Sequence, residues 1–217
     1  RQTERTAIPT DIFTEQEDTL ITFHFLPRER LELLHFHGIQ LRRRGRRDGL
    51  VAGLSGYLGE RFAKIADIYG ADVTTLEVEW GQAADADSVR ESIRAMAGEG
   101  RSPRAVLVTF NETSTGVTNP IAQLAGAIRE AAPQTLILVD GVSGIGAMPF
   151  QMDAWDIDVV VTGSQKAWMI PPGLAMAAAS ERAWAAAATA TMPRFYFDLA
   201  RHRDVLEGLA AAVAGRR

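Results

Sequence analysis

The 217-residue sequence contains no cysteine, and only two of its 23 basic residues are lysines. Without cysteine the chain has no disulfide framework and no thiolate chemistry. A net charge of −4 argues against general binding to nucleic acid or anionic membranes. No signal peptide or membrane span is visible, so the cytoplasm is the expected location. The scarcity of lysine makes the two that are present, Lys64 and Lys166, informative.

Lys166 comes directly after an apolar run, residues 157–163, that has the composition of a buried strand. Desolvation at such a position favours the neutral form of a lysine. A neutral amine is a nucleophile and suits Schiff-base chemistry. Lys64, in contrast, lies in an amphipathic helical pattern over residues 61–69 and is expected to face solvent. Lys166 is therefore the candidate catalytic residue.

A carboxylate, Asp140, ends a second apolar run, and a glycine-containing turn follows it at residues 141–144. It precedes Lys166 by 26 residues. A pyridoxal phosphate (PLP) enzyme requires this pair of groups. The carboxylate keeps the pyridine nitrogen protonated, so that the ring acts as an electron sink, while the lysine carries the aldimine. Taken alone, Asp140 is equally well explained as a helix N-cap or a metal ligand.

Strand-like and helix-like segments alternate from residue 50 onward, which predicts an α/β fold with a mainly parallel sheet flanked by helices. The expected strands are 50–54, 72–78, 105–110, 135–140, 158–162 and 174–179, and the expected helices are 60–69, 85–97, 119–132 and 181–189. Ligands of open α/β sheets sit at the carboxyl ends of strands. Thr113, Asp140 and Lys166 all lie at or just beyond such ends.

Three sequence blocks, in this order along the chain, carry a family resemblance. They read SGYLGERF (residues 55–62), FNETSTGV (110–117) and VDGVSGIGAMPFQMDAWDIDVVVTGSQKAWMIPPGLAMAAAS (139–180). The last block resembles the class V aminotransferases of PLP fold type I, in the serine–pyruvate/alanine–glyoxylate branch. The first two are similar to that family's N-G-x-[FW]-G-x-R and H-x-E-[ST]-S-T-G segments, and RFYFDL (194–199) resembles a later one.

The resemblance implies a PLP-dependent aminotransferase that moves an amino group from serine or alanine to glyoxylate or pyruvate. It gives Lys166 the aldimine role and makes Asp140 the partner of the pyridine nitrogen. Val142 would pack under the ring. Thr113 would hydrogen-bond near the phenolic oxygen, and Gln165 would help to hold the phosphate.

Two departures from the family pattern predict weaker cofactor binding. Leu58 falls where the family has an aromatic residue stacked on the ring, and an aliphatic side chain cannot reproduce that stacking. The family also has a glycine-rich turn whose backbone N–H groups cup the phosphate at a helix N-terminus. This chain has FHFLPRER at residues 23–30 instead, with no glycine before Gly38.

Five of the six residues at 42–47 are arginine. This basic run could bind nucleic acid, be an ordinary solvated segment, or result from a shifted reading frame. We favour the frame shift, because residues 37–48 can be encoded so that the next frame reads Thr-Ala-Phe-Asn-Ser-Gly-Asp-Ala-Val-Val-Ala, similar to the family sequence in this region. Sequencing the encoding DNA tests this hypothesis, and an open frame without a shifted match would contradict it.

The expected organisation is an atypical segment (1–48), a PLP-binding large domain (49–200) and a truncated tail (201–217), with the family's C-terminal small domain missing. Because that domain normally supplies the arginine for the substrate carboxylate, we expect little turnover. The resemblance implies a homodimer. The alternatives are a non-catalytic remnant or interaction protein, or a PLP-dependent lyase on the same fold. No metal site is expected, because His24, His35 and His37 have no cysteine or carboxylate cluster nearby.

Overall fold

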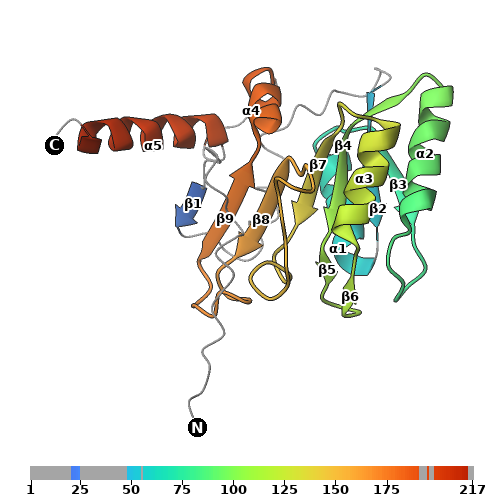
Figure 1. Cartoon of the computed structure of the whole chain (residues 1–217), viewed down its shortest axis with the longest axis horizontal. Coiled ribbons are helices and arrows are strands. Elements are labelled where there is room, and N and C mark those ends of the chain that lie inside the picture. The colour runs from blue at the N-terminus through green and yellow to red at the C-terminus, as the bar shows by residue number, and fades with distance from the viewer. Residues whose placement is uncertain (1–20, 25–47, 55, 191–194, 196–197, 215–217) are drawn as a thin grey trace, which may run out of the picture.

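A seven-stranded sheet forms the centre of the molecule, with the strand order β1-β9-β8-β7-β4-β2-β3 (Figure 1). The computed structural model describes residues 21–24, 48–54, 56–190, 195 and 198–214. The strands are β1 Ile21–His24, β2 Asp48–Leu54, β3 Val73–Glu77, β4 Ser102–Thr109, β7 Leu136–Asp140, β8 Val159–Gly163 and β9 Leu174–Ala179. Neighbours from β3 to β8 are parallel, and β9 runs antiparallel to both β8 and β1. The sheet is therefore mainly parallel, as predicted.

Helices α1 Gly56–Ile68, α2 Ala86–Gly98 and α3 Ile121–Ala131 lie between successive parallel strands from β2 to β7. Two further helices, α4 Glu181–Ala188 and α5 Leu199–Ala214, follow β9. A small hairpin, β5 Asn111–Glu112 with β6 Val117–Thr118, follows β4. All six strands and four helices expected from the sequence are confirmed, with bounds that differ by a few residues. The sequence reasoning did not anticipate β1, the β5–β6 hairpin or α5.

Two apolar cores lie on opposite faces of the sheet. Val106 and Val108 of β4 belong to the core that α2 and α3 cover, whereas Ala105 and Leu107 belong to the core on the side of α1. Successive side chains of a strand point to opposite faces. The stretch Ala105–Val108 of β4 is therefore buried on both sides and is continuously apolar, as parallel strands under helices are. Burial of each large aliphatic side chain contributes about 1.5–3 kcal/mol.

A buried ionic cluster closes the sheet at the amino end of β8. The Asp158 side chain is fully buried and lies 2.5 Å from Nη2 of Arg129 and 3.1 Å from Nε of Arg182. It also accepts hydrogen bonds from the backbone N–H of Ile137 and the hydroxyl of Ser180. Every oxygen of this carboxylate therefore has partners, and one side chain joins α3, β7, β8 and α4.

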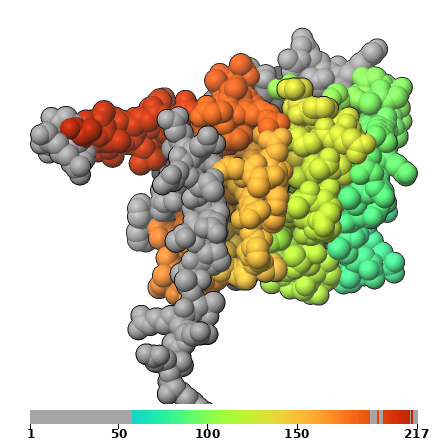
Figure 2. Space-filling model, in the orientation of Figure 1, coloured from blue at the N-terminus to red at the C-terminus, as the bar shows by residue number. Residues whose placement is uncertain are grey.

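Helix α5 projects away from the sheet, beyond the edge formed by β1 (Figures 1 and 2). Its side chains Val205 and Leu209 are 62% and 59% exposed. Within the described ranges, no helix is both long enough and apolar enough to cross a lipid bilayer.

Candidate active site at the carboxyl edge of the sheet

Strands β4, β7 and β8 are neighbours and parallel, so they end at the same edge of the sheet. This edge lies at the bottom of Figure 1, where the β5–β6 hairpin is seen. Thr113 follows β4 within that hairpin, Asp140 is the last residue of β7, and Lys166 lies three residues beyond β8. The fold thus brings to one edge the three residues that the sequence places far apart.

Asp140 is 8% exposed and lies on the face of the sheet that α1 covers. This follows from alternation, because Leu136 and Leu138 of the same strand belong to the α1-side core. Its Oδ1 accepts the backbone N–H of Val142 at 2.9 Å. Turns rather than a helix follow Asp140, so the helix N-cap interpretation is wrong. No group of three potential metal-binding side chains occurs among the described residues.

Lys166 lies in a turn whose two ends are held together by Ser164. The Ser164 side chain is fully buried, donates a hydrogen bond to the carbonyl of Pro171 at 2.8 Å and accepts one from the N–H of Leu174 at 3.3 Å. Lys166 itself is half-buried. It is therefore held beyond the end of the strand, at a position that a ligand and solvent can reach, whereas Lys64 is exposed on α1 as predicted.

The turn that carries Lys166 packs directly against the loop that follows Asp140. Gly146 of that loop has a φ of +89°, and a Cβ added there would lie 3.2 Å from the Cβ of Ala167. A side chain at residue 146 would thus be strained by the backbone and would crowd the residue after Lys166. Glycine at residue 146 therefore allows the loop after Asp140 to pack closely against the turn that carries Lys166.

Thr113 is tied to the same loop by a hydroxyl network. Its Oγ1 donates to Oγ of Ser143 at 3.1 Å, and the Asn111 side-chain amide donates to the same oxygen at 3.0 Å. The Ser143 hydroxyl in turn donates to the Asn111 carbonyl at 2.8 Å. Ser143, which sequence reasoning missed, therefore holds the Thr113 segment next to the loop after Asp140.

Leu58 lies in the first turn of α1, and its backbone N–H donates to Oε2 of Glu112 at 2.9 Å. Glu112 is buried and was not singled out from the sequence. The hydrogen bond joins positions 54 residues apart. It brings the beginning of α1 to the segment that carries Thr113. Five of the six predicted cofactor-binding residues thus belong to segments that meet at this edge of the sheet: Leu58, Thr113, Asp140, Val142 and Lys166.

The described residues also fit the cofactor expected from the sequence. The Gln165 side chain folds over Gly163, so that a Cβ added at Gly163 would lie 3.0 Å from Gln165 Oε1, and this buried oxygen has no partner within the described structure. A buried amide without a partner is unfavourable unless a ligand satisfies it, and a half-turn about its last torsion presents the N–H groups to a phosphate. Thr109, in register with Asp140 on β4, likewise has a buried hydroxyl without a partner among the described residues.

Several sequence predictions lie outside the described residues. These are the segment expected in place of the phosphate-binding turn from residue 25 onward, and the basic run at 42–47. His35 and His37 belong to the same undescribed stretch. Ile21–His24 is described as an edge strand paired with β9, so part of the segment 1–48 joins the sheet.

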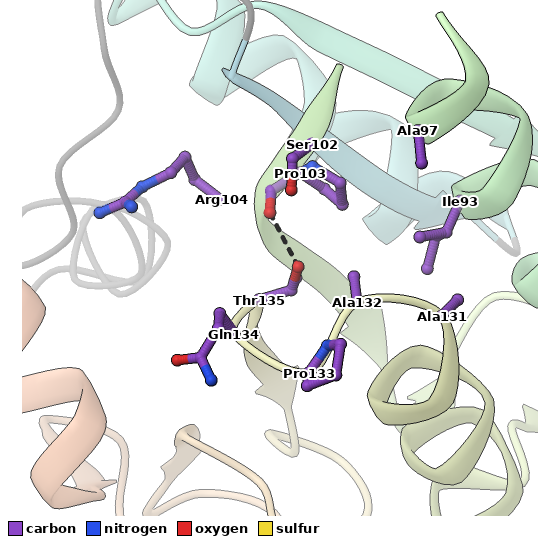
Figure 3. Close-up of a pocket in the computed structure, with 10 residues that line it drawn as sticks. All are labelled: Ile93, Ala97, Ser102, Pro103, Arg104, Ala131, Ala132, Pro133, Gln134 and Thr135. Atoms are coloured by element: carbon purple, nitrogen blue, oxygen red, sulfur yellow. Dashed lines mark hydrogen bonds between the residues drawn. The ribbon is translucent and has the colours of Figure 1, made fainter. Parts of the chain in front are cut away.

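A hollow of about 340 Å³ lies at the opposite edge of the sheet (Figure 3). It is formed where α2 and α3 end and where β4 and β7 begin, and the hydroxyl of Thr135 donates to the carbonyl of Pro103 across its floor at 2.8 Å. Because it lies at the amino ends of the strands, it is separate from Asp140 and Lys166.

Comparison with known proteins identifies the family of the chain. A family model described as "Aminotransferase class-V" matches residues 56–192. An L-aspartate–glyoxylate aminotransferase of Paracoccus denitrificans is 42% identical over 163 residues, which cover 75% of this chain and 40% of that protein. A serine–glyoxylate aminotransferase of Methylorubrum extorquens is 37% identical over 158 residues, covering 70% and 39%. The chain thus spans about two-fifths of the length of these curated relatives.

A solved structure shares the fold. The ureidoglycine–glyoxylate aminotransferase of Bacillus subtilis superimposes with a TM-score of 0.73 and 28% identity, over 86% of this chain and 46% of that one. The PLP fold type I architecture predicted from the sequence is therefore confirmed. Since the family model matches more than half of the sequence, the chain belongs to the class V aminotransferases.

Proposed function

We propose that this chain provides the PLP-binding part of an aminotransferase that transfers an amino group from serine, alanine or a similar small amino acid to glyoxylate or pyruvate. The observation that carries the proposal is the packing of the loop after Asp140 against the Lys166 turn, at the carboxyl edge of β7 and β8. The glyoxylate aminotransferases among the relatives support glyoxylate as the acceptor.

Asp140 and Lys166 would perform the central chemistry. When bound, PLP supplies an electron-withdrawing ring that stabilises the charge left on the α-carbon of an amino acid after loss of its proton. The carboxylate of Asp140, oriented by the Val142 N–H, would keep a proton on the ring nitrogen. The Lys166 amine would hold the cofactor's aldehyde and, when free, would take the α-proton and return it to a neighbouring atom.

The remaining predicted residues would position the cofactor. Gln165, whose buried amide oxygen has no partner among the described residues, would bind the phosphate. Thr113, held by Ser143, would contact the phenolic oxygen. Val142 and Leu58 would contact the ring faces, Leu58 with less stacking energy than an aromatic residue.

A cytoplasmic homodimer is the assembly that we propose. Its support is an apolar surface beside the site, where Met169 is 86% exposed and Ile170 45% exposed in the turn that carries Lys166. Exposed apolar residues next to a functional loop are typical of interfaces. A monomer in sedimentation experiments at micromolar concentration would contradict this assembly.

The test is a visible-absorption titration of the chain with PLP. We expect a new band characteristic of a lysine–PLP linkage, and its loss in Lys166→Ala. Lys64→Ala is the matched control, because Lys64 is the other lysine of the chain and is exposed on α1. Borohydride reduction followed by peptide mass spectrometry identifies the modified lysine.

The competing proposal is a remnant that no longer binds the cofactor. Leu58 and the sequence FHFLPRER at residues 23–30 favour it, because both depart from the family pattern at cofactor-binding positions. No band in a chain that circular dichroism shows to be folded would support the remnant. Equal labelling of the chain and of Lys166→Ala would contradict the role of Lys166.

A further inference from the structure

Glu112 is a carboxylate with 1% exposure at the end of β5. Its Oε2 accepts the backbone N–H of Leu58 at 2.9 Å. Its Oε1 accepts both the backbone N–H of Ser114 at 2.9 Å and the Ser114 hydroxyl at 2.7 Å. An ionised carboxylate accepts hydrogen bonds and donates none. Here the two oxygens of Glu112 accept hydrogen bonds from two separate segments.

The beginning of α1 explains why a negative charge is favourable at this place. The first N–H groups of a helix have no partner within the helix, and the N-terminal end carries a partial positive charge that an anion stabilises. No acidic residue occurs in the first turn of α1 itself. Glu112 therefore serves the first turn of α1 from 54 residues away in the sequence.

The hydrogen bonds of Glu112 join two segments that carry proposed cofactor-binding residues. Leu58 is the position that would contact the ring, and Ser114 follows Thr113 directly. Given the proposed function, on which this inference rests, we propose that Glu112 is a positioning residue of the cofactor site. It fixes residue 58 relative to Thr113 without contacting the cofactor itself.

The substitution Glu112→Gln separates this role from simple space filling. It would keep the shape of the side chain but would replace one acceptor oxygen by an NH2 group. This group should face the single N–H of Leu58, because the other oxygen accepts two bonds from Ser114. One of the two segments is then released. Ser114→Ala is the matched control, because it removes a hydroxyl from the same carboxylate while leaving the Leu58 bond intact.

The first measurement is amide hydrogen exchange of Leu58 by NMR, which needs no cofactor. We expect at least tenfold faster exchange at Leu58 in Glu112→Gln, unchanged exchange in Ser114→Ala, and unchanged exchange at the core amides of β7 in both. Unchanged Leu58 exchange in Glu112→Gln would overturn the proposal. If every amide of Glu112→Gln exchanged faster, the variant would be unfolding. Glu112→Asp, which keeps the charge but shortens the side chain, would then be measured instead. Faster exchange at Leu58 with unchanged β7 amides would support the proposal, and unchanged Leu58 exchange would overturn it.

The second measurement uses PLP affinity and Leu58→Trp. Restoring an aromatic ring at residue 58 should tighten PLP binding roughly three- to tenfold, and the gain should disappear in the double variant with Glu112→Gln. An equal gain in both backgrounds would mean that Glu112 does not position residue 58. Absence of PLP binding in every variant would refute the proposed function instead, while the exchange result would still show whether Glu112 holds α1.

Discussion

Asp158 is a carboxylate with no exposed surface, held between two arginines at the edge of the sheet opposite Lys166. Asp158→Asn keeps an acceptor for the Ile137 N–H but turns an amide N–H toward a guanidinium. Breaking a buried ion pair by removing one partner costs about 3–5 kcal/mol. We therefore expect Asp158→Asn to lower the free energy of unfolding by about 3 kcal/mol, measured by urea denaturation.

The neighbouring Asp156 is the control for that substitution. Its side chain pairs with the same two arginines but is 52% exposed. Exposed ion pairs contribute about 0–1 kcal/mol, so Asp156→Asn should lower the free energy of unfolding by less than about 1 kcal/mol. Equal losses in the two variants would show that burial does not decide the strength of this cluster.

Helix α2 has a cap that makes its stability depend on pH. The Asp85 side chain accepts the backbone N–H and the hydroxyl of Ser88, both at 2.8 Å. These bonds, the backbone one first, hold the pKa of the Asp85 carboxyl below its ordinary value of 3.8. Because the pKa is lower in the folded state, the stabilisation is complete above the ordinary value and is lost as the pH falls through the folded-state value.

Asp85→Ala should accordingly lower the urea midpoint at neutral pH. The difference in urea midpoint between this variant and the unsubstituted chain should become smaller as the pH falls below about 4. Asp85→Asn retains a good capping residue but cannot titrate. The difference in urea midpoint between Asp85→Asn and Asp85→Ala should therefore stay constant from neutral pH to below about 4. A gap between the unsubstituted chain and Asp85→Ala that is the same at neutral and acid pH would contradict the assigned cause.

The elements differ in how far the sequence predicts them. Strands β4, β7 and β8 can be predicted from their apolar runs, because both faces of these strands are buried. Strand β1 cannot, since it has four residues and joins the sheet by pairing with β9 alone. Most of helix α5 falls in the segment that the sequence predicts to be a truncated tail (201–217), although its alanines are strong helix formers.

The same division holds in the candidate site. The positions of Asp140 and Lys166 at or just beyond the ends of β7 and β8 could be predicted, because their residue types stand out after apolar runs. Glu112, Ser143 and Ser164 could not, because their hydrogen bonds join segments that no local pattern connects. The residue bonded to Glu112 lies 54 positions away in the sequence, and the one bonded to Ser143 lies 32 positions away. Only the folded sheet brings these partners together.

On the scale of the whole molecule, a ligand that binds only the folded chain raises its stability by mass action. The proposed cofactor would join the ends of β7 and β8 with α1, so its binding energy should resist global unfolding. At a PLP concentration of about 100 times the dissociation constant, the expected stabilisation is about 2.7 kcal/mol. Thermal unfolding with and without PLP measures it.

Asp140→Asn should reduce this stabilisation, because it removes a charge-assisted hydrogen bond worth about 1.5–3 kcal/mol to the ring nitrogen. Binding then weakens roughly tenfold or more, and at the same PLP concentration the stabilisation falls to about 1.4 kcal/mol or less. Asp204→Asn, an exposed carboxylate on α5, is the control and should retain the full shift. If PLP stabilised Asp140→Asn and Asp204→Asn equally, the carboxylate at the end of β7 would not hold the cofactor, and the site would have to be sought away from this edge of the sheet.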